Sequence, residues 1–169
     1  MTIRTATHRD AAACAAIYAP YVTGTAISFE ETPPSAEQIA ERISGSHAWL
    51  LAEDSDGAIA GYAYASRHAE RAAYRWTADV AIYLAAPYHG RGLGRELYGE
   101  LFTLLREGGM RMLCAGITLP NPASEGLHVA MGFEEVGVYR RVGYKLGAWH
   151  DVRWYQLDLR PGDAGPPPG

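Results

Sequence analysis

The sequence predicts a single mixed α/β domain in which one sheet carries crossover helices. Three observations support this prediction. The chain has 169 residues, enough for one well-buried core and too few for two ordinary domains. Strand-like and helix-like apolar runs follow the order strand, two helices, three strands, helix, strand, helix, two strands. The composition, 48% hydrophobic and 20% charged, is typical of a globular protein.

The N-terminal part of the chain is expected to hold a short strand and two helices. The run TIRTA can form the strand, and an alanine-rich helix follows it and stops near Pro20 and Gly24. The second helix, AEQIAERISG, begins after Ser35, which has capping-box spacing with Gln38. Gly45 can end this helix.

The middle of the chain contains three strand-like runs and the clearest helix. The runs HAWLLAE and AIAGYAYAS flank DSDG, which is typical of a hairpin turn. A third run, TADVAIYLA, ends at Pro87. Leucines at helical spacing then predict a helix over residues 92–107, with arginine and glutamate on its other faces.

The C-terminal part is expected to add a strand, a helix and two more strands. RMLCAGIT has the pattern of a buried strand, and NPASEGLHVAMG that of an N-capped helix closed by Gly132. EVGVYRRVGYK and WHDVRWYQLDL predict the last two strands. We therefore expect a domain over residues 1–160, followed by a disordered Pro/Gly-rich tail over residues 161–169.

Charge and composition exclude several function classes. A net charge of −4 gives no general reason to bind nucleic acid. The N-terminus lacks the apolar core of a secretory signal, and no apolar run approaches the roughly 20 residues of a membrane span. We therefore expect a cytoplasmic protein with no membrane partner. Cys14 and Cys114 are far apart and predict buried reduced thiols, and the six histidines show no metal-ligand spacing, so no metal is expected.

The segment HGRGLG is a loop almost without side chains between a predicted strand and a predicted helix. Such a loop lets a ligand approach the backbone, and the start of a helix favours an anion, above all a phosphate. The loop of nucleotide hydrolases is excluded because the chain has no Gly-Lys pair. A dinucleotide-binding loop would need a third glycine where Leu97 stands. A tight turn without a ligand is the remaining alternative.

Two motifs resemble those of the GNAT acyl-CoA N-acetyltransferases. HGRGLG resembles the pattern Q/R-x-x-G-x-G/A, with His89 where glutamine or arginine is usual. NPASEGLHVAMGF resembles a second pattern, N-x-x-S-x-x-L-Y/H-x-x-x-G-F, and the resemblance extends over about residues 1–160. It implies the GNAT fold, a mixed and mostly antiparallel seven-stranded sheet flanked by about four helices. It also implies acetyl-CoA as cosubstrate.

Longer segments resemble a narrower group, the phosphinothricin and methionine sulfoximine N-acetyltransferases. They are GTAISFEETPPS, AAYRWTADVAIYL and the run from Leu127 to Gln156. The resemblance implies acetylation of the α-amine of a small amino-acid analogue by direct attack, in a homodimer. Two alternatives stay open: a peptide or protein N-terminal acetyltransferase, and a CoA-binding module without catalysis. Similarity of this kind fixes the reaction type more firmly than the substrate.

The resemblance also assigns residues to the cofactor. The backbone of residues 82–84 would pair with the pantetheine arm, residues 90–95 would hold the pyrophosphate, and Asn121 would contact the cofactor beyond the thioester. Core packing for the strand, a solvated position for Arg95 and a helix N-cap for Asn121 are the simpler alternatives. The cofactor set is Ile82, Tyr83, Leu84, Gly90, Arg91, Gly92, Leu93, Gly94, Arg95 and Asn121.

The chemistry needs a base, because an alkylammonium must lose a proton before it attacks a thioester. Asp79 is our leading candidate, at a position where the resembled enzymes carry glutamate, and its short side chain favours a water relay. Glu30 and Glu31, in the SFEET loop, are second candidates, and solvated loop charges are the simpler alternative for them. His128, in the second motif, could act as acid or base.

A substrate carboxylate or phosphinate needs a cationic partner. Arg71, Tyr74 and Arg75 precede the cofactor strand and suit that role. Exposed loop arginines are the simpler alternative.

Overall fold

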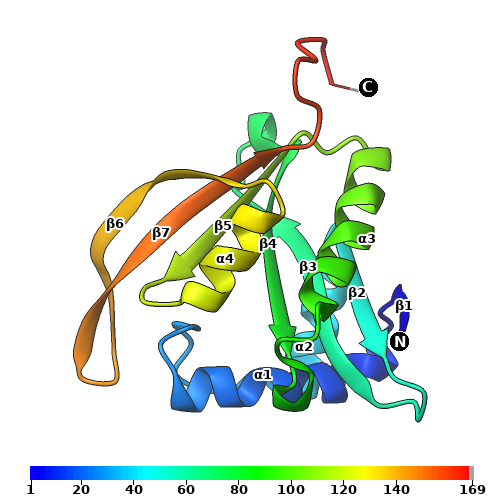
Figure 1. The fold of residues 1–169 in the computed structure, drawn as a ribbon, viewed down its shortest axis with the longest axis vertical. Helices are drawn as coiled ribbons and strands as arrows, with labels where there is room; N and C mark the ends of the chain where they lie inside the picture. The colour runs from blue at the N-terminus through cyan, green and yellow to red at the C-terminus, as the bar shows by residue number, and fades with distance from the viewer. Residues whose placement is uncertain (168–169) are drawn as a thin grey trace.

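The computed structural model describes residues 1–167, which form one seven-stranded sheet in the order β1-β2-β3-β4-β5-β7-β6. Among these strands β4 and β5 are the one parallel pair, and all other neighbours are antiparallel. The expected order of helices and strands is confirmed (Figure 1). The elements are β1 (Thr2–Thr5), α1 (Ala11–Gly24), α2 (Ala36–Gly45), β2 (Ala48–Glu53), β3 (Ile59–Arg67), β4 (Thr77–Leu84), α3 (Leu93–Glu107), β5 (Met112–Thr118), α4 (Pro122–Ala130), β6 (Glu134–Lys145) and β7 (Ala148–Asp158).

Helices bury both faces of the sheet. On one face, Leu97 and Leu101 of α3 are fully buried in the larger hydrophobic cluster. On the other face, Tyr18 and Val22 of α1 pack in a second cluster that includes Trp49 of β2. The apolar residues that recur at helical spacing in α3 thus form a stripe that faces the sheet, as the sequence predicts.

Local sequence signals explain most element ends. The Ser35 hydroxyl accepts from the Gln38 amide at 3.2 Å, and the Gln38 side chain accepts from the Ser35 amide at 2.9 Å, so the capping box is confirmed. The DSDG turn is confirmed too, with Gly57 at φ +83°. Pro20 does not end α1, which continues to Gly24. Burial of Tyr18 and Val22 on either side of Pro20 keeps this last turn helical.

The pairing of β4 and β5 is short. It consists of three residue pairs and ends at Asp79 and Cys114. Beyond this point β5 continues against β7, while β4 continues only against β3 (Figure 1). One edge of β4 is therefore left without a strand partner over residues 80–84.

The hairpin of β6 and β7 extends beyond the rest of the sheet and is anchored by the only lysine of the chain (Figure 1). The Lys145 ammonium donates to the carbonyls of Val22 and Ser28, each at 2.6 Å, and the side chain is buried. Next to it the Phe29 ring lies on Gly143, where a Cβ would overlap the ring. The hairpin thus holds the segment that follows α1.

The last segment of the chain follows β7 and belongs to no helix or strand up to residue 167. A turn follows β7, in which the Asp163 amide donates to the Arg160 carbonyl at 3.1 Å, and the Gly165 amide then donates to the Asp163 carboxylate at 2.9 Å. The expected tail of residues 161–169 extends past the described part of the chain, since residues 168–169 lie outside it. Among residues 1–167, no helix is both long and apolar enough to cross a membrane.

The Lys145 anchor should contribute measurably to stability. In Lys145→Met the stem still packs, but two carbonyls lose their donor, so the free energy of unfolding should fall by about 1–3 kcal/mol. Urea denaturation measures this change. Arg9→Met, at an exposed cation outside the anchor, is the control and should change stability little. Equal stability of the two variants would contradict the anchor.

Candidate active site

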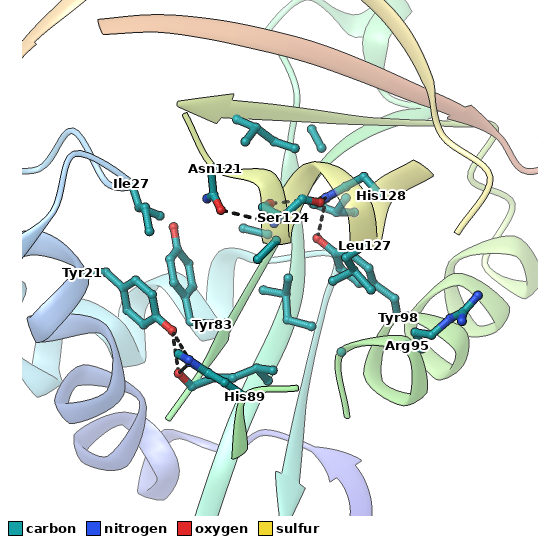
Figure 2. Close-up of a pocket in the computed structure, with 18 of the residues that line it drawn as sticks. Tyr21, Ile27, Tyr83, His89, Arg95, Tyr98, Asn121, Ser124, Leu127 and His128 are labelled. Atoms are coloured by element: carbon teal, nitrogen blue, oxygen red, sulfur yellow. Dashed lines mark hydrogen bonds between the residues drawn. The ribbon is translucent and has the colours of Figure 1, made fainter. Parts of the chain in front are cut away.

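A cavity of about 440 Å³ opens where β4 and β5 diverge. Its walls come from the C-terminal half of β4, the loop before α3, the end of β5 and the first turns of α4. Figure 2 shows side chains from separate elements around this space, with Tyr83 and His89 on one side and Asn121 and His128 on the other. The cavity is therefore a direct result of the early end of the β4–β5 pairing.

The unpaired edge of β4 borders this cavity. Residues 80–84 line it while their other edge is paired with β3. Backbone N–H and C=O groups on such an edge can bind an extended, amide-containing ligand as they would bind another strand. This edge supplies a binding surface that does not depend on side chains.

The glycine loop forms the end of the cavity next to α3. Gly90 and Gly92 adopt φ values of +71° and +83°, which other residues rarely adopt. Gly92 is the N-cap of α3, so the first amides of the helix open into a region free of side chains. Gly94 is buried, and a Cβ there would come within 3.1 Å of Leu127. The loop is suited to an anion held by backbone amides.

A second cavity, of about 540 Å³, adjoins the first. Tyr64, Ser66 and Asp79 line it together with aromatic and aliphatic side chains. The two cavities share residues at the point where the strands diverge, so that a ligand in one can meet a ligand in the other. The shared residues are Ile27, Val80, Ala81, Gly116 and Thr118.

Residues 3–154 match the acetyltransferase (GNAT) domain family. The chain belongs to the GNAT family. It is 40% identical over 168 residues to a phosphinothricin N-acetyltransferase of Alcaligenes faecalis, covering 96% of this chain and 84% of that protein. It is also 32% identical over 169 residues to an L-methionine sulfoximine/L-methionine sulfone acetyltransferase of Pseudomonas paraeruginosa, covering 98% of each.

A solved structure also supports membership of the GNAT family. The crystal structure of a GNAT superfamily phosphinothricin acetyltransferase from Sinorhizobium meliloti in complex with AcCoA matches with a TM-score of 0.94 and 36% identity. The match covers 99% of this chain and 92% of that one. The expected GNAT fold is thus confirmed, and this chain is an acetyl-CoA-dependent N-acetyltransferase. A CoA-binding module without catalysis is thereby set aside.

The first cavity suits acetyl-CoA as cosubstrate. The free edge of β4 fits an amide-rich arm, and the bare loop at the start of α3 fits a pyrophosphate. Of the ten residues expected at the cofactor, eight line this cavity. They are Ile82, Tyr83, Leu84, Gly90, Gly92, Gly94, Arg95 and Asn121.

Arg91 and Leu93 do not line the cavity with the others. The Arg91 guanidinium lies 5.8 Å from the centre of the Tyr88 ring, on the exposed side of the loop. Leu93 is buried in the core under α3. The cofactor role expected of these two residues stays a prediction. Arg95 lines the cavity, and its guanidinium donates to the Ala130 carbonyl at 3.4 Å.

His89 ties the glycine loop to the end of β4. Its Nε2 lies 3.0 Å from the Leu84 carbonyl and 3.0 Å from the Tyr21 hydroxyl. Tyr21 of α1 also donates to the Leu84 carbonyl, at 2.6 Å (Figure 2). Sequence reasoning missed Tyr21, because nothing in the pattern of α1 distinguishes a tyrosine that faces the cavity from one that faces the core.

The start of α4 holds Asn121 and His128 in different ways (Figure 2). The Asn121 side chain accepts from the Ser124 amide at 3.2 Å, so it caps the helix while it lines the cavity.

His128 is buried in the same helix. Its Nδ1 donates to the Ser124 carbonyl at 2.7 Å, and its Nε2 accepts from the Tyr98 hydroxyl at 3.0 Å. Burial lowers the pKa of His128 and favours the neutral ring. The expected acid–base role of His128 stays a prediction.

The two candidate carboxylates lie in different surroundings. Asp79 lines the second cavity, and burial raises its pKa above the ordinary value for aspartate. Glu30 lies outside both cavities, where it forms an ion pair with Arg42 and accepts from the Tyr18 hydroxyl at 2.6 Å. The Arg42 guanidinium lowers the pKa of Glu30. Of these two carboxylates, Asp79 lines a cavity and Glu30 does not, and the catalytic roles expected of both stay predictions.

The residues expected to bind the substrate lie around a short 3-10 turn, Ala72–Tyr74. Arg71, Tyr74 and Arg75 are exposed and line neither cavity. Arg75 donates to the Ala72 carbonyl at 3.0 Å and lies over the Trp76 ring. Their role at the substrate stays a prediction.

The glycine loop gives a sharp test of the cofactor site. Gly92→Ala forces a left-handed conformation on alanine, which costs about 1–2 kcal/mol and displaces the loop amides. The Kd for CoA should therefore rise by about tenfold in titration calorimetry. Gly99→Ala, on the exposed face of α3 with nothing near its Cβ position, is the control. An unchanged Kd in Gly92→Ala would exclude the loop from CoA binding.

Proposed function

We propose that this enzyme acetylates the primary amine of a small amino-acid-like substrate of the phosphinothricin, methionine sulfoximine or methionine sulfone type. The observation that carries the proposal is the meeting of the two cavities at the divergence of β4 and β5. The first cavity suits the cosubstrate, and the second offers a carboxylate within a pocket for the amine. The names of the relatives support the substrate class.

In this proposal Asp79 is the base. It accepts a proton from the substrate ammonium, directly or through one water, and the freed amine attacks the thioester carbonyl. The carbon–sulfur bond then breaks, the nitrogen loses the extra proton, and the departing thiolate takes up that proton, so that the amide and the CoA thiol are the products. Asp79 belongs to the last residue pair before the opening, next in the chain to Val80 and Ala81 of the shared wall. Cys14 is buried and lines neither cavity, which agrees with direct transfer.

The walls of the second cavity favour a small substrate over a peptide. Ile27 and Phe29 come from the segment after α1, and Tyr139 and Val142 come from β6. Lys145 fastens these two segments to each other. A peptide would need an open groove at this place. The N-terminal acetyltransferase alternative therefore has less support than the amino-acid reading.

A cation for the substrate carboxylate completes the proposal. Arg71, Tyr74 and Arg75 remain our candidates, because the Tyr74 ring lies 5.6 Å from the ring of His68. His68 in turn contacts Asp79 in the second cavity. In this proposal an exposed arginine side chain turns toward the second cavity and binds the substrate carboxylate or phosphinate through its guanidinium.

We further propose a homodimer in the cytoplasm. Six apolar side chains of the last hairpin are more than half exposed, an arrangement that suits a protein interface. Two of them, Tyr139 and Val142, also line the second cavity, so a partner would help to close it. Both cysteines are free thiols, which agrees with a reducing compartment. The six are Val136, Tyr139, Val142, Tyr144, Leu146 and Trp149.

The function is tested by thiol release from acetyl-CoA. We expect turnover with phosphinothricin, methionine sulfoximine or methionine sulfone above that with ordinary amino acids or a short peptide. Asp79→Asn removes the base and should lower kcat by about a hundredfold or more, with CoA affinity retained. Asp56→Asn, in the exposed hairpin turn, is the control. Preferred turnover of the peptide would contradict the substrate class, and full activity of Asp79→Asn would contradict the base.

The dimer is tested by light scattering after gel filtration. Trp149→Glu places a charge in the exposed apolar surface of the hairpin and should yield a monomer. Leu104→Glu makes the same kind of change at an exposed leucine of α3 and should leave the dimer intact. A monomeric wild-type protein, or a dimer that survives Trp149→Glu, would exclude this interface.

A further inference from the structure

His68 lies beside the candidate base, although no sequence motif singled it out. It follows the last residue of β3 and continues the alternation of Tyr64 and Ser66, both of which line the second cavity. Ser66 is paired with Asp79 across the two strands. His68 and Asp79 therefore lie on the same face of the sheet, at the edge of the cavity.

We propose that His68 is a positioning residue that holds Asp79 in its ionised form and directs one of its oxygens to the amine. The geometry that supports this is the hydrogen bond from Nδ1 of His68 to Oδ1 of Asp79, at 2.6 Å. Because Oδ1 is engaged, Oδ2 is left to accept the substrate proton. The inference rests on the proposed function, in which Asp79 is the base.

The hydrogen bond from His68 opposes the effect of burial on the pKa of Asp79. Asp79 is partly withdrawn from water, and this burial raises its pKa. A carboxyl that is protonated cannot accept a proton from the amine. The hydrogen bond and the charge interaction with His68 lower the pKa of Asp79 and oppose the effect of burial. Loss of His68 should therefore raise the pKa of Asp79.

The other groups that face the pair do not supply this effect. Cys114 of β5 lies within 4.8 Å of both, and burial raises the pKa of its thiol to about 11. Burial also raises the pKa of Tyr64 of β3 to about 12. Tyr74 adds a phenol ring against the imidazole. Within residues 1–167, His68 is the one basic side chain that bonds to Asp79.

The ring of His68 is also partly exposed to solvent. Its side chain is 28% exposed, and that of Asp79 33%. The pair is therefore only partly enclosed, and it avoids the large desolvation penalty of a fully buried pair. A hydrogen-bond donor in this place can orient and stabilise the carboxylate.

Two variants of His68 separate a positioning role from a structural one. His68→Asn keeps an N–H donor near the place of Nδ1, whereas His68→Leu keeps bulk and removes the donor. In His68→Leu the acid limb of the pH profile of kcat/KM should move up by about one pH unit. Its kcat at pH values near that limb should fall by about tenfold. In His68→Asn, both the acid limb and kcat should stay close to their wild-type values.

The titration of Asp79 is measured without turnover by carboxyl-carbon NMR, with Asp79→Asn to assign the resonance. We expect the pKa of Asp79 to rise in His68→Leu and to stay near the wild-type value in His68→Asn. Cys114→Ser, which changes another neighbour of Asp79 and removes no basic group, is the control and should leave the acid limb unchanged.

The outcomes distinguish this inference from the proposed function. An Asp79 pKa that is the same in wild type and His68→Leu would overturn the inference. An Asn variant that behaves as the Leu variant would overturn it as well. If the Asp79 pKa rises as expected but the wild-type enzyme turns over no amine, the electrostatic role of His68 stands and the proposed function fails.

Discussion

The pairing of β4 with β5 ends after Asp79 and Cys114, and the site depends on this short pairing. If the two strands stayed paired, their backbone groups would satisfy each other and no space would exist between them. Because they diverge, β4 keeps a free edge, and the first amides of α3 open into the same space. The candidate base lies at the vertex, where the cofactor cavity meets the second cavity.

The amine side of the site depends on contacts between distant parts of the chain. The Lys145 ammonium reaches carbonyls more than a hundred residues earlier, at the end of α1 and in the segment after it. An ammonium near the C-terminus of a helix also interacts favourably with the helix dipole. Glu30, outside both cavities, links the segment after α1 to Arg42 of α2 and Tyr18 of α1. The segment and the hairpin thus form one unit around the second cavity.

Much of the fold could be predicted from the sequence, because it depends on local patterns, and most residues expected at the cofactor line one cavity. The capping box at Ser35, the hairpin turn and the leucine stripe of α3 each act within a few residues, and all appear where expected. Gly92 was identified because only a residue without a side chain suits its backbone. Pro20 was read as part of a helix end, and tertiary burial of its neighbours overrode this local preference.

The sequence by itself determined the family, the cosubstrate and the order of the elements, since short motifs and periodicities carry that information. Only the tertiary structure decided the surroundings of the two candidate carboxylates. Asp79 and Glu30 are equivalent as residue types, but one faces a cavity and the other an arginine. The contact of His68 with Asp79 is also visible only in the tertiary structure, because the two residues are eleven positions apart and Asp79 lies on the next strand. Side-chain burial and pairing across strands set protonation, and these are properties of the folded chain.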